Sequence, residues 1–503
     1  MSGPATALIR AGRAVAVGGA TGRHVLATEA WAALPAALAA EPRLALLGLW
    51  GEAGVVHAAF LDEESEEVFL ATADGAAFAS LAAARPGAAL MERAARDLWG
   101  IDAVDAVDRR PWLDHGRWPV TAPMSARPRP RDGAPPQPTF LPVEGEGIHV
   151  IPVGPIHAGI IEPGHFRFHV QGEAVVRLEV RLGYVHKGIP GLMRGKSPRA
   201  ASPFPGRISG DSTVAHSLAF ARAAEAATAH TPPPRAIWLR AVMAECERIA
   251  NHLNDWGFVC NDASFAFPHA RTGLLREGLL RACEAAFGHR LMMDRVLPGG
   301  VATDLDAAGI ATLRAAMAAI GAEVPGLLRI YDTHASLQDR VVGTGIIATH
   351  LAARYGAGGV VGRASGRGFD ARRLPGSMPY DALDFAIPVL PSGDVDTRVR
   401  VRVAEITASI GLVGRLLDGL PEGAIHAPVP IRGGEGIAIV EGFRGDVLHW
   451  LRLDDGGLIE ACFARDPSWF HWPLLEAAVE GNIVADFPLI NKSINASYSG
   501  VDL

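Results

Sequence analysis

The sequence predicts an α+β protein, with a small N-terminal α/β domain and a large, mainly α-helical domain that opens with a β-hairpin or small sheet. Short strand-like segments separated by turns fill residues 1–121, and prolines crowd residues 122–146. Long segments with helical spacing dominate residues 147–503. Because proline lacks the backbone N–H of regular structure, we expect the middle segment to be an extended linker.

The N-terminal domain is predicted from composition and spacing. Apolar segments bounded by short turns are typical of strands at 44–50, 55–61 and 67–71. The segment LMERAARDLW, residues 90–99, places Leu90, Ala94 and Leu98 on one side of a helix. We therefore expect a small sheet that packs against at least one helix.

The large domain is predicted to begin with strands and to continue with helices. The first strands are expected at 149–153, 165–170 and 175–180. Helices are expected at 212–229, 237–255, 272–291, 305–322 and 399–417. Further strands are expected at 436–441 and 446–453. The final segment, 486–503, mixes apolar residues with specific polar ones, so we expect it to enter the core.

Composition disfavours several classes of protein. The 47 Lys and Arg residues against 54 Asp and Glu residues give a net charge of -7, whereas bulk nucleic-acid binders are normally basic. Neither a long uncharged apolar run nor a secretory signal is evident, so we expect a cytoplasmic chain without a membrane span. The four cysteines are not clustered, which disfavours a zinc or iron–sulfur site held by this chain alone. We expect Cys246 and Cys283 to be small buried core residues.

Titratable groups gather in the segment GPIHAGIIEPGH, residues 154–165. It carries His157, Glu162 and His165 beside isoleucines, and its glycines and prolines indicate a shaped loop. Titratable groups held against an apolar wall favour proton transfer. The alternative is a hairpin whose polar side chains are solvated.

The helix expected at 237–255 carries a second polar group. Glu245, Arg248 and His252 are spaced three and four residues apart, so they share one face. This ridge faces either a buried polar pocket or, as is more common, solvent.

The segment RISGDSTVAH, residues 207–216, contains Ser212, a suitable N-cap for the helix that follows. Gly210 beside it indicates a tight turn that approaches another group closely. Neither a nucleophile elbow nor a dinucleotide fingerprint is evident, so NAD is not expected to bind this chain.

Several segments resemble one superfamily. In the large domain they are GPIHAGIIEPGH, RLGYVHKGIPGLMRGK, CNDASFAFPHARTGLLRE, DRVLPGGV, DRVVGTGII, GRASG and DFPLINKSINASYSGVDL. They resemble the large subunits of membrane-bound nickel–iron hydrogenases of formate-hydrogenlyase type and the D-type subunit of respiratory complex I. In the first domain, ERAARDLWGI and RPWLDHGRWP resemble the C-type subunit of complex I. The resemblance implies the corresponding folds over nearly the whole chain.

The sequence departs from the hydrogenases at the metal ligands. Metal-binding members hold nickel and iron with two cysteine pairs, the first in an Arg-x-Cys-Gly-x-Cys motif. Here Ser209 and Ser212 replace the first pair, and Ser497 and Gly500 replace the second. Hydroxyls cannot supply the thiolate bridges of that centre, so we expect neither a nickel–iron centre nor H₂ chemistry. The sequence ends at Leu503 without the His-bearing extension that a protease removes in metal-loaded members, so no such processing is expected.

Other aligned positions imply proton and electron transfer. Glu162 matches the glutamate that carries protons from the hydrogenase metal site, and His157 matches a neighbouring family histidine. These two residues are therefore the implied catalytic groups. The quinone-binding His and Tyr of D-type subunits fall on Ile161 and Gly210, so the standard quinone contacts are missing.

A further set of residues is expected to face a partner. His186, Lys187 and His252 align with groups near the terminal iron–sulfur cluster of the adjoining small subunit. Together with Arg207 and Gly210, they are expected to line a cavity for that cluster or a quinone-like acceptor. A cation near a reduced cluster would stabilise its added negative charge.

The resemblance implies a subunit of an energy-converting oxidoreductase complex at the cytoplasmic face of the cell membrane. The implied partners are an iron–sulfur small subunit, antiporter-like membrane subunits and a dehydrogenase that supplies electrons from NAD(P)H, formate or ferredoxin. The chain and the small subunit would form the cavity that couples electron transfer, with a quinone as one candidate acceptor, to proton or cation movement. Two alternatives stay open: a non-catalytic structural or coupling subunit, and a hard-cation site formed by Ser209, Asp211, Ser212 and Asp502.

Overall fold

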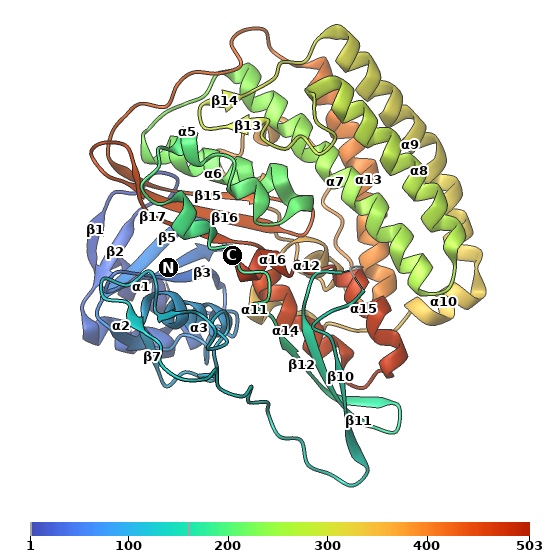
Figure 1. The fold of residues 1–503 in the computed structure, drawn as a ribbon. Helices are drawn as coiled ribbons and strands as arrows, with labels where there is room; N and C mark the ends of the chain where they lie inside the picture. Colours follow the sequence, from blue (N-terminus) through green and yellow to red (C-terminus); the bar gives the residue numbers. More distant parts are fainter. Residues whose placement is uncertain (1–2, 159–160) are drawn as a thin grey trace.

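The computed structural model describes residues 3–158 and 161–503 (Figure 1). The predicted α+β class is confirmed. The N-terminal part contains a five-stranded sheet in the order β1-β2-β5-β4-β3, with β2 parallel to β5 and the other pairs antiparallel. Its elements are α1 Pro4–Arg10, β1 Arg13–Val15, β2 Arg23–Leu26, α2 Thr28–Ala39, β3 Leu44–Glu52, β4 Val55–Asp62, β5 Glu67–Asp74 and α3 Ala88–Trp99.

Strand β3 is buried on both faces, and this position joins the two halves of the molecule. Leu46 and Leu49 belong to the main core, whereas Leu47 and Trp50 pack toward a second sheet. Successive residues of a strand normally face opposite sides. The pairing of β3 with β4 is irregular between Leu46 and Gly48, which explains why these four side chains do not alternate strictly. The Trp50 ring stacks on Phe463 of the second sheet, with 4.7 Å between ring centroids.

The second sheet consists of β15 Gly434–Glu441, β16 Asp446–Leu453 and β17 Ile459–Arg465, all antiparallel. Helix α6, Thr213–Ala227, packs on it. A Cβ atom on Gly436 would lie 2.2 Å from the carbonyl oxygen of Ala223, so only glycine permits this close approach of helix and strand. The sequence prediction contained β15 and β16 but missed β17.

Long helices form the other side of the large domain (Figure 1). Helix α7, Pro234–Asp262, packs against α8, Ala266–Phe287, and α13, Val395–Asp418, and α9, Ala307–Thr333, packs on α8. The expected helix at 237–255 is thus part of a longer one. Cys246 on α7 and Cys283 on α8 are buried, as predicted.

Contrary to the sequence expectation, one helix in the described part of the chain is long and apolar enough to cross a membrane. This helix is α9, judged by its length and composition. A core helix of a soluble protein can pass the same test, so α9 alone is weak evidence for a span. Arg314 and Glu323 of α9 form ion pairs with Asp418 and Arg271.

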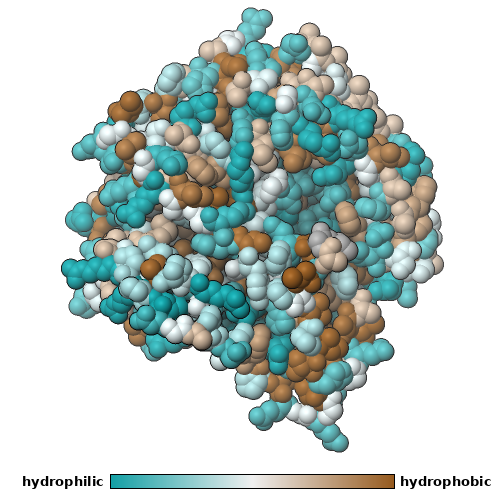
Figure 2. Space-filling model, viewed as in Figure 1, coloured by the Kyte–Doolittle hydropathy of each residue, from teal (hydrophilic) through white to brown (hydrophobic). Residues whose placement is uncertain are grey.

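A three-stranded sheet at one end of the molecule consists of β10 Ile148–Val153, β11 His165–Gln171 and β12 Ala174–Arg181. Helix α14, Ser468–Val479, packs against β12. Figure 2 shows apolar side chains gathered over this end of the molecule. Of the loop that carries the expected proton groups, Gly159 and Ile160 lie outside the described residues.

The linker and the tail contrast strongly. Residues 122–146 are largely exposed and irregular, apart from a two-residue pairing of β8, Val120–Thr121, with β9, Arg129–Pro130. The tail forms α15 Phe487–Ile494 and α16 Ser499–Asp502, and its last nine residues are mostly buried, which confirms the prediction that it enters the core. The remaining helices and strands are β6 Ala77–Ala79, β7 Asp102–Val104, α4 Ile189–Met193, α5 Pro198–Ala201, β13 Val296–Leu297, β14 Gly300–Val301, α10 Ala335–Val341, α11 Thr349–Tyr355 and α12 Gly359–Ala364.

Candidate functional site

The positions of the missing thiolates lie together at the buried tail. Ser209 precedes α6, whereas Ser497 and Gly500 belong to the tail. The Oγ atoms of Ser209 and Ser497 are 2.8 Å apart, although the residues are 288 positions apart in sequence. The backbone N–H of Gly500 donates to Ser497 Oγ at 2.9 Å. The three positions that the resemblance matches to metal ligands therefore lie together in the fold.

Arg444, in the turn between β15 and β16, joins this group. Its Nη1 donates to Asp211 Oδ1 at 2.7 Å, to Ser212 Oγ at 3.1 Å and to Ser209 Oγ at 3.5 Å. Burial raises the pKa of Asp211, but the charge and hydrogen bonds of the Arg444 guanidinium outweigh burial and hold that pKa below its usual value. The pair is therefore ionised, and a permanent cation contacts two former ligand positions.

These residues do not fit a nickel–iron centre. Such a centre is soft and needs thiolates, whereas the local donors are hydroxyls, and the Arg444 guanidinium would repel a metal cation. A Cβ atom on Gly500 would lie 2.7 Å from Asp466 Cγ, so a cysteine there would require a shift. Within the described ranges, no group of three or more His, Cys, Asp or Glu residues is arranged to hold a metal ion.

The hard-cation alternative is not favoured by this geometry. Asp211 is paired with Arg444. Asp502 accepts hydrogen bonds from the backbone N–H groups of Gly183 and Val185 at 2.7 and 3.0 Å. The two carboxylates therefore have separate partners on separate segments.

Asp502, near the end of the tail, belongs to a second cluster. Burial raises its pKa to about 7, and the negative charge of Glu162 adds to that effect. Glu162 Oε2 accepts a hydrogen bond from the backbone N–H of Ser499 at 3.2 Å. Partial desolvation lowers the pKa of Lys187, whose Nζ donates to the carbonyl of Ile208 at 2.9 Å. This cluster can hold or release a proton near neutral pH.

A buried chain of polar side chains continues from the tail into the core. Asp466, which lies against Gly500, is 3.0 Å from His216 Nε2. The Nδ1 of His216 is 3.1 Å from His449 Nε2. Burial holds the pKa of His449 well below its usual value, so this ring is neutral. The sequence prediction missed this chain because its members come from α6, β16 and the segment after β17.

The two predicted histidines near the hairpin are tied to the backbone. His157 Nε2 is 2.7 Å from the carbonyl oxygen of Gly164, within the same loop. His186 Nδ1 is 2.5 Å from the carbonyl oxygen of Asp502, and burial lowers its pKa. The structure thus brings His186 to the Asp502 cluster, whereas His157 contacts its own loop and Phe166.

Arg207 and Gly210 differ from the predicted pattern. The guanidinium of Arg207 forms a two-pronged ion pair with the half-exposed Asp294, and its carbonyl accepts from Lys187 at 2.7 Å. A Cβ atom on Gly210 would meet no atom within 4 Å. The space beside Gly210 within this chain is therefore open, and its close approach to another group stays a prediction.

The ridge on α7 is buried, which contradicts the more common solvated arrangement. Glu245, Arg248 and His252 are each 1% exposed or less. His252 Nε2 is 2.7 Å from Glu405 of α13, and Arg363 also pairs with Glu405 at 2.7 Å. His252 therefore lies inside an ionic network between helices and does not reach the surface of this chain.

Ser212 does not cap α6 as predicted. Its side chain makes no capping hydrogen bond, and the carboxylate of Glu247 accepts from the N–H groups of Val214 and Ala215 at 2.6 and 3.0 Å. Burial raises the pKa of Glu247 to about 8. A residue of a neighbouring helix took the capping role, which local sequence cannot reveal. Arg444 was missed for a similar reason, since the only local signal is its place in a turn between two expected strands.

Comparisons with known proteins agree with this architecture. Residues 274–432 match the family described as the respiratory-chain NADH dehydrogenase 49 Kd subunit. The carbon monoxide-induced hydrogenase of Rhodospirillum rubrum is 32% identical over 70% of this chain and 98% of its own length. Formate hydrogenlyase subunit 5 of Escherichia coli is 29% identical over 83% of this chain and 75% of its own length.

A third relative lies on the complex I side. The D-type subunit of NADH-quinone oxidoreductase from Dehalococcoides mccartyi is 28% identical over 70% of this chain and 98% of its own length. These relatives are hydrogenases and subunits of oxidoreductase complexes. The chain belongs to the superfamily of hydrogenase large subunits and D-type subunits of NADH-quinone oxidoreductase.

Proposed function

We propose that this chain is a redox-coupling subunit of a membrane-associated, energy-converting oxidoreductase complex that works without a nickel–iron centre. One observation carries the proposal: the hydroxyls of Ser209 and Ser497, at positions that we match to thiolates of metal-binding members, bond to each other, and the Arg444–Asp211 ion pair lies against Ser209. The charges at this site are paired within the protein, and its oxygen donors are not soft metal ligands.

The proton-holding cluster supports a catalytic rather than a merely structural role. Asp502, with a pKa of about 7, lies next to Glu162 and Lys187, so a proton can be exchanged there at physiological pH. In our proposal, electrons arrive through an iron–sulfur small subunit, and a proton from the Asp502 cluster accompanies reduction of a quinone or another acceptor. A quinone would meet an exposed isoleucine at 161 and the open surroundings of Gly210 in place of the usual His and Tyr.

The surface supports a partner at the hairpin end. Ile156 is 83% exposed in the loop after β10, and Val150 and Ile161 are also exposed. Exposed apolar side chains on one loop are typical of protein contacts. We propose that this end packs on the iron–sulfur subunit and on antiporter-like membrane subunits at the cytoplasmic face, while a separate dehydrogenase supplies the electrons.

A second candidate is a non-catalytic coupling subunit. The Arg444 cluster favours it, because a self-compensated ion pair has no free group for chemistry. The two candidates differ in whether protonation at the Asp502 cluster limits turnover.

The decisive experiment uses the intact complex purified from membranes. Its nickel content and H₂ evolution should both be absent, and stoichiometric nickel with H₂ evolution would refute the proposal. Glu162→Gln should lower donor-driven acceptor reduction by about 100-fold if Glu162 passes protons. The matched control is Glu173→Gln, an exposed carboxylate at the turn between β11 and β12. Full activity in Glu162→Gln would favour the coupling-only candidate.

A further inference from the structure

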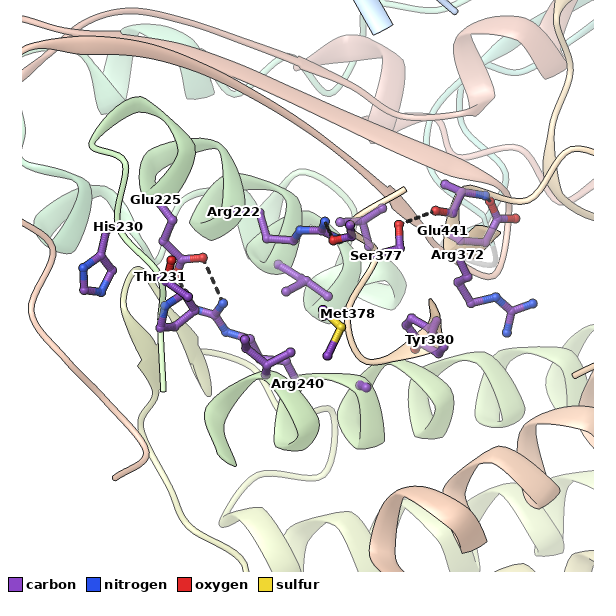
Figure 3. A pocket seen from close by; sticks show the side chains of 17 residues that line it. Arg222, Glu225, His230, Thr231, Arg240, Arg372, Ser377, Met378, Tyr380 and Glu441 are labelled. Atoms are coloured by element: carbon purple, nitrogen blue, oxygen red, sulfur yellow. Dashed lines mark hydrogen bonds and ion pairs between the residues drawn. The ribbon is translucent and has the colours of Figure 1, made fainter. Parts of the chain in front are cut away.

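A cavity of about 230 Å³ lies away from the residues discussed above, between α6, the start of α7, β15 and the loop at 371–380 (Figure 3). Its wall is partly apolar, with Leu218, Ile237, Met378 and Val440. This volume is below the roughly 300–1,000 Å³ of pockets for drug-sized ligands, so a dinucleotide is too large.

Three guanidinium groups line this cavity, and two of them are paired with carboxylates. Arg240 Nη2 is 2.6 Å from Glu225 Oε1. Arg372 pairs with Asp370 at 2.7 Å and with Glu245 at 3.1 Å. The charges of these arginines are therefore compensated within the protein.

The carboxylates that line the cavity are also occupied. Glu225 binds Arg240 through both oxygens and accepts from the N–H of Gly299. Glu441 pairs with Arg363 at 2.8 Å and accepts from the N–H of Ala371 at 2.9 Å. Neither carboxylate is paired with the remaining guanidinium.

The third guanidinium, that of Arg222, has no ion-pair partner among the described residues, although the charge of Glu225 acts on it from a greater distance. Its one hydrogen bond to the described residues goes from Nη2 to the carbonyl oxygen of Gly376 at 3.1 Å. Among residues 3–158 and 161–503, no carboxylate lies within 4.0 Å of it. Figure 3 shows Arg222 reaching from α6 toward Ser377 and Met378, across the cavity. Arg222 is partly buried, and desolvation lowers its pKa although the negative charge of Glu225 acts in the opposite direction.

A second polar group at the cavity lacks a partner. The Nε2 atom of His230 is buried and makes no hydrogen bond to any described residue, and His230 belongs to the cavity lining. Figure 3 shows His230 apart from Arg222, beyond Glu225, so the anion is expected at Arg222. A guanidinium without an ion-pair partner beside an apolar wall is complementary to an anion with an apolar body.

We propose that this cavity binds a small organic carboxylate. The carboxylate would accept two parallel hydrogen bonds from the Arg222 guanidinium, and its hydrocarbon part would lie on Leu218 and Met378. Inorganic phosphate fits less well, because it carries more charge and would leave the apolar wall uncovered. This inference is independent of the proposed redox role, since the cavity contains none of Glu162, Lys187 and Asp502.

The test is calorimetric titration of the full chain with hexanoate, acetate and inorganic phosphate. Hexanoate should bind more tightly than acetate, because it also covers the apolar wall. Arg222→Gln should weaken hexanoate binding by at least about 10-fold, the effect expected for a charge-assisted hydrogen bond. Arg281→Gln is the matched control, since Arg281 lies on the exposed face of α8 and its one ion-pair partner among the described residues is Glu277. This control should bind hexanoate as the wild type does.

Further variants keep the test decisive if Arg222→Gln does not fold. Arg222→Lys retains the charge but not the fork, so it should give intermediate affinity. Met378→Trp fills the cavity without removing charge and should abolish binding. The proposal is overturned if hexanoate does not bind the wild type, if its affinity is unchanged in these variants, or if phosphate is the only anion that binds.

Discussion

The Arg444 cluster and the Asp502 cluster flank the same buried tail, yet their carboxylates behave in opposite ways. Asp211 has a lowered pKa because the Arg444 guanidinium contacts it, so it remains ionised. Burial raises the pKa of Asp502 to about 7, and the nearby charge of Glu162 adds to that effect, because its backbone N–H donors offset burial only in part. Burial acts in the same direction on both. The fully buried Asp502 has no cation in contact among the described residues, whereas the partly exposed Asp211 has one, and these two differences make one carboxylate a proton carrier and the other a fixed charge.

The largest expected effect concerns turnover. Replacing Asp502 by Asn should lower donor-driven acceptor reduction by the intact complex about 100-fold, because the proton-exchanging group is lost. The control, Asp132→Asn in the exposed linker, should retain full activity. An Asp502→Asn complex with wild-type rates would show that the two clusters do not differ in function.

The next effect is a pH dependence of stability. The pKa of Asp502 is raised from 3.8 to about 7 on folding, so between these values the folded chain holds a proton that the unfolded chain has lost. The free energy of unfolding should therefore fall as the pH rises from about 4 to 7 and level off above 7.

Urea unfolding at pH 5 and pH 8 measures this effect. The wild type should lose about 2 kcal/mol relative to Asp502→Asn across that interval. Parallel pH profiles for the two proteins would contradict the raised pKa.

A smaller effect is expected at the ion pair. Arg444→Met leaves Asp211 and two hydroxyls without their cation, which should lower the free energy of unfolding by about 1 to 2 kcal/mol. We expect less than for a fully buried pair, since the Asp211 side chain is 37% exposed and solvent screens its charge. Adding Asp211→Asn should recover part of the loss. If the double variant is as unstable as the sum of both single variants, the two residues are not coupled.

The smallest effects distinguish two glycines at former family motifs. Gly500→Ala should lower the free energy of unfolding by about 1 kcal/mol, because the added methyl group would lie 2.7 Å from Asp466 Cγ. Gly210→Ala should change it by no more than about 0.5 kcal/mol, since its Cβ meets open space. Thermal melts of both variants against the wild type provide the measurement, and equal shifts would contradict the close packing of the tail against Asp466.

Local patterns predicted most regular elements and some of the site. The strands at 44–50 and 55–61 correspond to β3 and β4, and the pattern at 399–417 lies within α13. Element ends were less accurate: α7 extends seven residues beyond the expected end at 255. Such ends depend on packing against α8 and α13 rather than on periodicity. The solvated alternative for the α7 ridge and the predicted Ser212 cap were wrong for the same reason. Glu405, which contacts His252, and Glu247, which caps α6, both come from other helices.

The sequence by itself determined that positions 209, 212, 497 and 500 carry no thiol and that Glu162 carries a carboxylate, because the residue type fixes the chemistry of a side chain. Only the tertiary structure decided which charged and polar groups contact the residues at these positions. Arg444 meets Asp211 across 233 positions, and Asp502 meets Gly183 across 319. Charge state follows from burial and contact, and both arise only when distant segments pack together.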